Sequence, residues 1–248
     1  MKKLICMALT LLLVFGVCAC GKDETAIYGP FSMIDGKIAL EGVMMGDNYD
    51  DAKASVESRN LGTMETHFSS DGRYFEVFPD TAKEVGGIFY NNLSFTADMK
   101  NNNITMLGMG YQHEDVDDAI LNDTENLKKT VDEFFAPYKD AVKEVENVLV
   151  TKLPVIEYRT DGAGNREDMV FSYDGNEIYT MVFVDGKPVE VSSRSEAADM
   201  EGATILEITF YAQSLTQSDI DFYLNDDGQT YMGTMYVGVM VLPAEMLP

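Results

Sequence analysis

The feature that most constrains the fold of this chain is a series of short strand-like segments separated by Asp-Gly pairs. These pairs stand at positions 35–36, 71–72, 161–162, 174–175 and 185–186. Asp-Gly favours the tight turns that join antiparallel strands. No helix pattern follows each strand, which argues against a parallel sheet built from βαβ units. The sequence therefore predicts mainly antiparallel pairing.

Strand patterns cover much of the chain. The segment Tyr74-Phe75-Glu76-Val77-Phe78 alternates, as a strand does when one face of its sheet is covered and the other is exposed. Strands are expected at residues 31–34, 37–44, 63–69, 73–78, 88–90, 93–99, 104–111, 153–158, 169–173, 178–184, 188–191, 205–212 and 231–242. They form two strand-rich modules, 31–149 and 150–248.

Two helices stand out among these strands. A short helix is expected to start at Asp47 or Asn48 and to run through Arg59, because these residues can cap it and its apolar residues share one face. A long helix is expected from about Thr124 to Val148, where apolar residues recur every three or four positions. Pro137 lies inside this pattern and predicts either a kink or two consecutive helices. The predicted fold class is α+β, with antiparallel sheets, a short N-terminal helix and one long, kinked central helix; a further short helix is expected at 217–224.

The first twenty residues have the pattern of an export signal. Two lysines precede an apolar run from Leu4 to Val17, and Ala19 stands directly before Cys20. This segment resembles the signal peptide of bacterial lipoproteins. The resemblance implies that residues 1–19 are removed, that Cys20 is acylated, and that residues 20–30 tether the protein to the extracytoplasmic side of a cell membrane or outer membrane. An ordinary secretory signal is the alternative.

Composition narrows the possible chemistry. The cysteines are Cys6, Cys18 and Cys20, so cleavage before Cys20 leaves no second thiol for a disulfide or a cysteine-ligated metal. The formal charge of −24 argues against nucleic acid as a partner, because the phosphate backbone would be repelled.

A second resemblance concerns residues 38–112. The segment Gly42-Val43-Met44-Met45-Gly46 is followed by a predicted helix and then by a meander of strands. This order is similar to the helix-plus-meander modules of envelope lipoproteins in the SmpA/OmlA and β-lactamase-inhibitor-like group. The resemblance implies binding of a protein through an open sheet face and no catalysis.

Calcium is the metal that the sequence favours most, and no other cofactor is expected. Three acidic runs are rich in oxygen ligands, although none matches the EF-hand loop, and the third of them is Asn225-Asp226-Asp227-Gly228. The solubility of an acidic surface explains them as well. The candidate ligands are Asp47, Asp50, Asp51, Asp115, Asp117 and Asp118.

No catalytic residue is assigned. The chain has two histidines, His67 and His113, and lacks the GxSxG motif of a nucleophile elbow. We therefore expect a lipid-anchored cell-envelope protein that binds a protein or peptide at the cell surface without catalysis. Two alternatives stay open: an envelope hydrolase acting on a cell-wall polymer, and a calcium-dependent solute-binding module.

Overall fold

The fold is mostly antiparallel β-sheet. The computed structural model describes residues 24–68, 72–113, 124–143, 145–155, 157–160, 163–169, 171–212, 216 and 235–247. Strands account for 51% of the structure and helices for 20%. The prediction of an α+β fold with a long central helix was wrong, because the helices cover a large sheet and do not form a layer of comparable extent.

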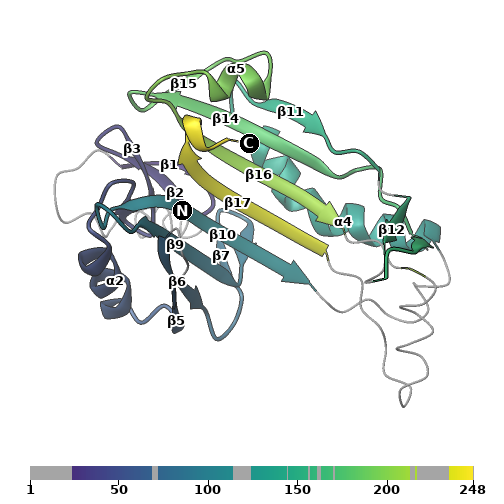
Figure 1. Cartoon of the computed structure of the whole chain (residues 1–248), viewed down its shortest axis with the longest axis horizontal. Helices are drawn as coiled ribbons and strands as arrows, with labels where there is room; N and C mark the ends of the chain where they lie inside the picture. Colours follow the sequence, from purple (N-terminus) through teal and green to yellow (C-terminus); the bar gives the residue numbers. More distant parts are fainter. Residues whose placement is uncertain are drawn as a thin grey trace, which may run out of the picture.

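The largest sheet has nine strands. Its order is β11-β14-β16-β17-β10-β9-β6-β5, and β15 pairs with the outer side of β14. Figure 1 shows β17 between β10 and β16, so strands from both predicted modules meet in one sheet. The strands are β5 (Thr63–Phe68), β6 (Gly72–Phe78), β9 (Asn92–Asp98), β10 (Ile104–His113), β11 (Leu149–Lys152), β14 (Glu177–Val184), β15 (Lys187–Val189), β16 (Thr204–Ala212) and β17 (Met235–Pro243).

Three smaller sheets accompany the large one. The first is a four-stranded meander of β1 (Glu24–Tyr28), β2 (Phe31–Ile34), β3 (Lys37–Leu40) and β4 (Val43–Met44). The others are the hairpins β7 (Lys83–Val85) with β8 (Ile88–Tyr90) and β12 (Tyr158–Thr160) with β13 (Arg166–Asp168). Strand β1 begins inside the stretch that we expected to be a tether.

Some predicted strand limits were wrong. The strand expected over 37–44 is divided, because Glu41 and Gly42 adopt positive φ angles of 49° and 74° and form a turn. Strands expected at 153–158 and 169–173 are replaced by β11, β12 and β13, which lie elsewhere in that stretch. The helix expected at 217–224 lies outside the described residues.

The helices are α2 (Tyr49–Ser58), α4 (Thr124–Lys143), α5 (Arg194–Ala198) and the short 3₁₀ helix η1 (Ala244–Met246). Asn48 caps α2, since its Oδ1 accepts hydrogen bonds from the backbone N–H groups of Asp50 and Asp51. Helix α4 ends at Lys143, earlier than the predicted Val148, and packs on one face of the sheet.

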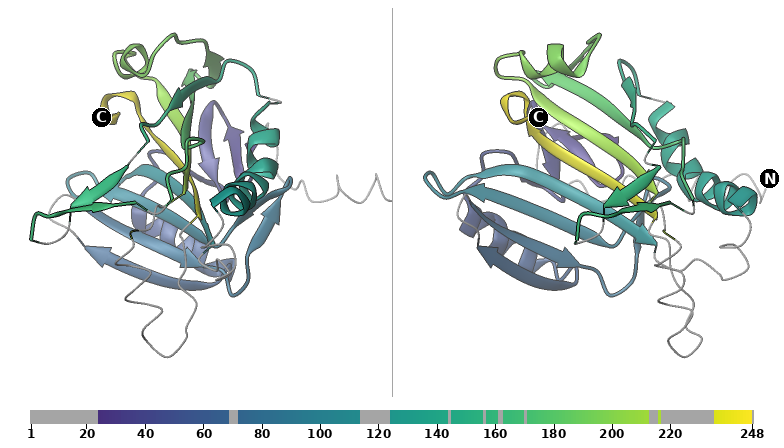
Figure 2. Two further views of the ribbon diagram at one scale, coloured as in Figure 1. Left: turned by 90° about the vertical axis from the view of Figure 1, so that its right-hand side faces the viewer. Right: turned by 45° about the vertical axis from the view of Figure 1, so that its right-hand side comes forward.

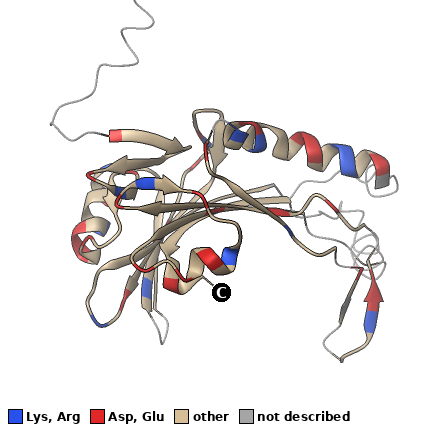
Figure 3. Ribbon diagram, turned by 90° about the horizontal axis from the view of Figure 1, so that it is seen from above, with Lys and Arg blue, Asp and Glu red and all other residues tan. Residues whose placement is uncertain are grey.

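The two faces of the nine-stranded sheet are covered differently. Figure 2 shows its strong twist, since the strands at the β6–β9 end and at the β14–β16 end run in clearly different directions. One face packs against α2, α4 and β1–β3 in the main core. Among the described residues, the apolar cover of the other face lies near β14 and β16, where α5 and η1 enclose a second apolar cluster. Figure 3 shows α4 and α5 on opposite sides of the sheet, with acidic residues spread over turns, helices and strand ends.

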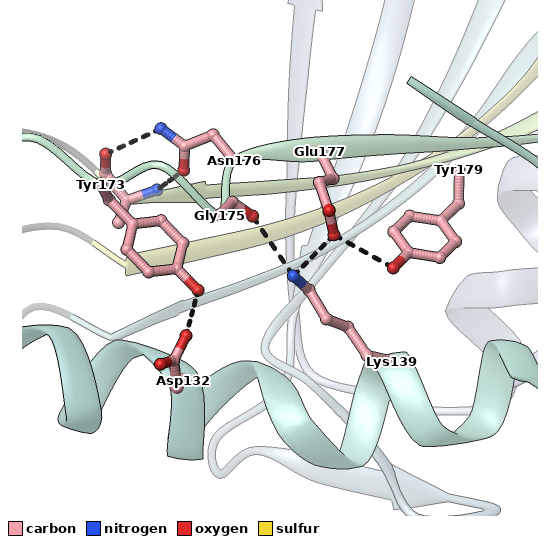
Figure 4. Close-up of polar contacts among 8 residues, drawn as sticks. Asp132, Lys139, Tyr173, Gly175, Asn176, Glu177 and Tyr179 are labelled. Atoms are coloured by element: carbon pink, nitrogen blue, oxygen red, sulfur yellow. Dashed lines mark hydrogen bonds and ion pairs between the residues drawn. The ribbon is translucent and has the colours of Figure 1, made fainter. Parts of the chain in front are cut away.

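Polar contacts fix α4 to the sheet (Figure 4). The Nζ of Lys139 donates hydrogen bonds to Glu177 Oε2 at 2.8 Å and to the carbonyl of Gly175 at 3.2 Å. It also lies 5.2 Å from the centre of the Phe210 ring. Two turns earlier, Asp132 Oδ1 accepts a hydrogen bond of 2.6 Å from the Tyr173 hydroxyl, and burial with this carboxylate raises the pKa of Tyr173.

None of the described helices is both long and apolar enough to cross a membrane.

Candidate binding groove

The uncovered part of the sheet contains a groove of about 810 Å³. It lies on the face opposite α4, beyond the area enclosed by α5 and η1, and is formed by β6, β9, β10, β16 and β17. Period-two alternation places its side chains, because the same strands turn their apolar residues to the main core. The side chains that the argument uses are Glu76, Asn92, Ser94, Thr209, Tyr236 and Met240.

Three glycines make the floor of the groove. Gly110 and Gly238 are cross-strand partners, and Gly108 is the partner of Met240. A Cβ on Gly238 would lie 2.3 Å from the Tyr236 hydroxyl, and a Cβ on Gly108 would lie 2.2 Å from the Ser94 hydroxyl. The missing side chains therefore leave space that Tyr236 and Ser94 partly occupy.

Tyr236 supplies an aromatic surface in the groove. Its ring approaches the Cβ positions of both Gly110 and Gly238, yet 36% of the side chain stays exposed. Burial of the remaining part raises the pKa of Tyr236. Met240 on the same strand is 41% exposed, so an aromatic and a thioether side chain are both available for contact.

The rest of the lining is polar and carries little charge. Asn92 Nδ2 donates to Glu76 Oε1 at 3.1 Å. Asn91 extends the ladder, since its side-chain amide exchanges hydrogen bonds with the backbone of Gln112 at 3.2 and 3.4 Å. Among the described residues that line the groove, Glu76 is the only acidic one, and none is a lysine or an arginine. The groove offers amides, hydroxyls and one carboxylate.

Glu76 connects the groove to the edge strand β5. Glu65 on β5 is its direct cross-strand partner. The Nε2 of His67 lies 3.3 Å from Glu76 Oε2 and 3.6 Å from Glu65 Oε2. The imidazole stacks on Tyr74 with ring centres 4.7 Å apart. These four side chains form a polar end of the sheet face, which we call the acidic margin.

The opposite end of this face contains a neutralised carboxylate. Glu207 is 7% exposed and receives two hydrogen bonds from the guanidinium of Arg194, at 2.9 and 3.0 Å. The Thr180 hydroxyl donates a third at 2.9 Å. This network holds α5 against the sheet and has no free capacity for a ligand.

Three of the predicted calcium ligands can be placed, and two of them accept hydrogen bonds from the protein itself. Asp47 Oδ2 accepts from the N–H of Met44 at 2.8 Å. Asp50 Oδ2 accepts from Asn102 at 2.9 Å and from Arg73 at 3.2 Å, and these bonds lower the pKa of Asp50. Asp51 lies in the first turn of α2, where an acid is favourable.

The second acidic run is not among the described residues, which leaves Asp115, Asp117 and Asp118 without a position. Within the described ranges, no group of three or more His, Cys, Asp or Glu side chains is arranged to hold a metal. Calcium binding stays a prediction, and so does acylation, because Cys20 lies before the first described residue.

Sequence reasoning missed the groove, although a signal was present. Gly108 and Gly110 alternate within one predicted strand, and Gly238 lies within another. Glycine inside a strand marks a position where another group approaches the backbone closely. Of the two histidines considered for catalysis, the structure places His67 beside two carboxylates on an open sheet edge.

No protein-family model matches the chain, and no curated protein or solved structure was found to be significantly similar to it. The resemblances described for the signal peptide and for residues 38–112 therefore stay predictions.

Proposed function

We propose that this chain is a lipid-anchored cell-envelope protein that binds a protein or peptide partner through the groove, without catalysing a reaction. The observation that carries the proposal is a glycine-floored sheet face that no described element covers, while the other face packs the main core. A sheet face without covering elements is available to a polypeptide. The packed face supplies stability, so the groove residues are free to vary with the partner.

The chemistry of the lining suits a polypeptide. Asn92, Ser94 and Thr209 offer donors and acceptors that match peptide groups. Tyr236 and Met240 add apolar contact area, and tyrosine is enriched at the energetic centres of protein interfaces. Methionine adapts to partners of different shape.

The predicted anchor restricts where binding takes place. Strand β1 begins at Glu24, four positions after Cys20. Such a segment spans at most about 14 Å when extended. Acylation of Cys20 would hold the sheet close to the membrane surface, and two or more acyl chains give stable attachment. The partner would therefore be met at the cell surface.

Site-specific photocrosslinking in intact cells tests this function. A photoreactive residue replaces Thr209 in the groove of the full chain, and the matched control replaces Val150, which is 47% exposed on β11 and pairs with Tyr179 on the opposite face. We expect a discrete adduct from position 209 and none from position 150. Equal adducts from both positions, or none from position 209, would refute the proposal.

Fractionation tests the anchor separately. The Cys20→Ala variant should leave the membrane fraction, while the unaltered chain should stay in it until detergent is added. A Cys18→Ala variant is the control, because the lipoprotein pattern assigns the acyl group to Cys20 alone. A Cys20→Ala protein that stays in the membrane fraction contradicts the predicted acylation.

A further inference from the structure

The edge strand β5 has an open backbone. It pairs with β6 alone, and in the described part of the chain its residues make no other backbone hydrogen bond. None of its six residues is Pro, Lys or Arg, and Glu65 is its one acidic side chain. The other margin of the sheet is shorter and better protected, with Lys152 ending β11 and Pro188 inside β15.

Charge distinguishes this edge as well. Glu65 and Glu76 lie directly opposite each other, and like charges in that position destabilise a strand pair. Glu207, by comparison, has the guanidinium of Arg194. Among the described residues, the imidazole of His67 is the one potentially cationic group within 4 Å of the Glu65–Glu76 pair. The acidic margin is thus complementary to a lysine or arginine, which no described residue places beside these two carboxylates.

The two sides of β5 differ in character. Glu65 and His67 project to the groove face, because they pair with Glu76 and Tyr74. Met64 and Phe68 project to the other face, and Phe68 is 72% exposed. A strand added to β5 would therefore place alternate side chains beside carboxylates and beside apolar groups.

We propose that β5 accepts an extended cationic segment of the partner as an additional strand. Its Lys or Arg side chains lie over Glu65 and Glu76, and its intervening apolar side chains lie beside Met64 and Phe68. This inference rests on the proposed function and specifies the partner: a segment with alternating basic and apolar residues. A second copy of the chain fits poorly, because each copy has a formal charge of −24 and would bring its own Glu65–Glu76 pair to the junction.

Calorimetric titration of the full chain in a nonionic detergent tests the proposal. The probe is an eight-residue peptide of alternating Lys and Val with blocked ends. One control peptide alternates Glu and Val. A second control is the Lys–Val peptide with every other backbone nitrogen methylated, so that one edge of the extended peptide cannot donate hydrogen bonds. Both alternations of methylation are prepared, because the docking edge of the peptide is not known in advance.

We expect saturable binding of the Lys–Val peptide, no binding of the Glu–Val peptide, and loss of binding for one of the two methylated forms. Binding of both methylated forms with unchanged affinity would overturn strand addition. Absence of Lys–Val binding, or a dimeric mass in light scattering that the Lys–Val peptide converts to a monomeric one, would overturn the proposal too.

Variants separate charge from folding. Glu65→Gln and Glu76→Gln should each weaken Lys–Val binding about threefold at low salt, the size of an exposed ion pair. Glu84→Gln on the hairpin β7–β8 is the matched control and should change nothing. The glutamine variants should melt at the same or a slightly higher temperature, so weaker binding cannot come from unfolding. Unchanged affinity in both variants contradicts the role of the acidic margin.

The photocrosslinking experiment distinguishes the two proposals. If adducts form at position 209 while the Lys–Val peptide fails to bind, the groove still has a partner and only the β5 inference falls. If neither result appears, the proposed function falls with it.

Discussion

The two faces of the nine-stranded sheet come from the same strands and differ in nearly every property. On the covered face Phe75, Phe95 and Leu107 are fully buried. On the open face their sequence neighbours include Glu76, Ser94 and Gly108. Period-two alternation lets one segment supply both sets. The comparison teaches that each strand contributes both to stability and to the proposed recognition. The residues for the two roles lie on opposite faces of the sheet and alternate along the chain.

The largest expected effect removes an aromatic side chain from the covered face. Phe135 on α4 is fully buried and lies 5.4 Å from Phe210, ring centre to ring centre. Phe135→Ala should lower the free energy of unfolding by about 3–5 kcal/mol in urea titration. The matched change on the open face, Met240→Thr, should lower it by less than about 1 kcal/mol. Similar losses in both variants would show that the open face is packed after all.

A smaller effect is expected at the polar contacts of α4. The Lys139 and Glu177 side chains are 22% and 15% exposed, so Lys139→Met leaves a half-buried carboxylate without its partner. We expect a loss of about 1–3 kcal/mol in urea titration. Lys129→Met is the control, because the Lys129–Glu133 pair is 73% and 68% exposed. A loss as small as that of the control would mean that solvent already screens the Lys139 pair.

Alkaline pH should lower the free energy of unfolding through a tyrosine on the covered face. Burial, together with Glu177, raises the pKa of Tyr179 from 10.0 to about 12. The unfolded chain releases this proton at lower pH than the folded chain, so stability is complete below pH 10 and declines as the pH rises toward 12. Urea midpoints between pH 9 and pH 12 should fall, and less steeply in Tyr179→Phe. Tyr158→Phe is the exposed control. If the urea midpoint falls with pH as steeply in Tyr179→Phe as in the unaltered chain, the loss of stability comes from other groups.

The groove floor should affect binding more than stability. In Gly238→Ala the new methyl group displaces the Tyr236 ring, whose hydroxyl lies 2.3 Å from the Cβ position. Relief of glycine flexibility opposes that displacement, so the free energy of unfolding should change by less than about 1 kcal/mol. The adduct from position 209 should nevertheless decrease. Gly202→Ala is the control, because Gly202 has a φ of +72° and no atom within 4 Å of its Cβ position. The adduct from position 209 should be unchanged in this variant.

The smallest expected effect is a gain in stability. Glu65→Gln removes one of two like charges that face each other across β5 and β6. The free energy of unfolding should rise by about 0.5 kcal/mol. A measured loss instead would show that His67 makes the pair favourable.

Sequence patterns located individual strands well where turns bounded them. Strand β2 between Gly-Pro and Asp-Gly, and β8 after Gly-Gly, have the predicted limits. Patterns failed where a strand begins with polar residues and where a helix is short. β1 was expected to be a tether because its first residues are polar, yet its pairing with β2 fixes it. Helix α5 was missed although Ser193 and Glu196 have the spacing of a capping box.

The fold class and the groove required tertiary information. The apolar stripe of α4 predicts a helix but not how many strands it covers, and the α+β prediction gave that helix too much weight. The groove depends on Gly110 and Gly238 lying opposite each other in β10 and β17, strands that the sequence separates by more than 100 residues. Period-two patterns state which residues share a face but not which strands are neighbours.

The position of β17 has a consequence for how the protein matures. It is the last strand of the chain, yet it lies between β10 and β16 and hydrogen-bonds to both. A chain that emerges from its N-terminus first therefore exposes two unsatisfied strand edges until residues 235–243 have appeared. Pairs of such high sequence separation form slowly, and open edges invite aggregation in the meantime. A chain truncated before Met235 should lack the joined sheet altogether, because β17 is the strand that pairs with both β10 and β16 among the described residues.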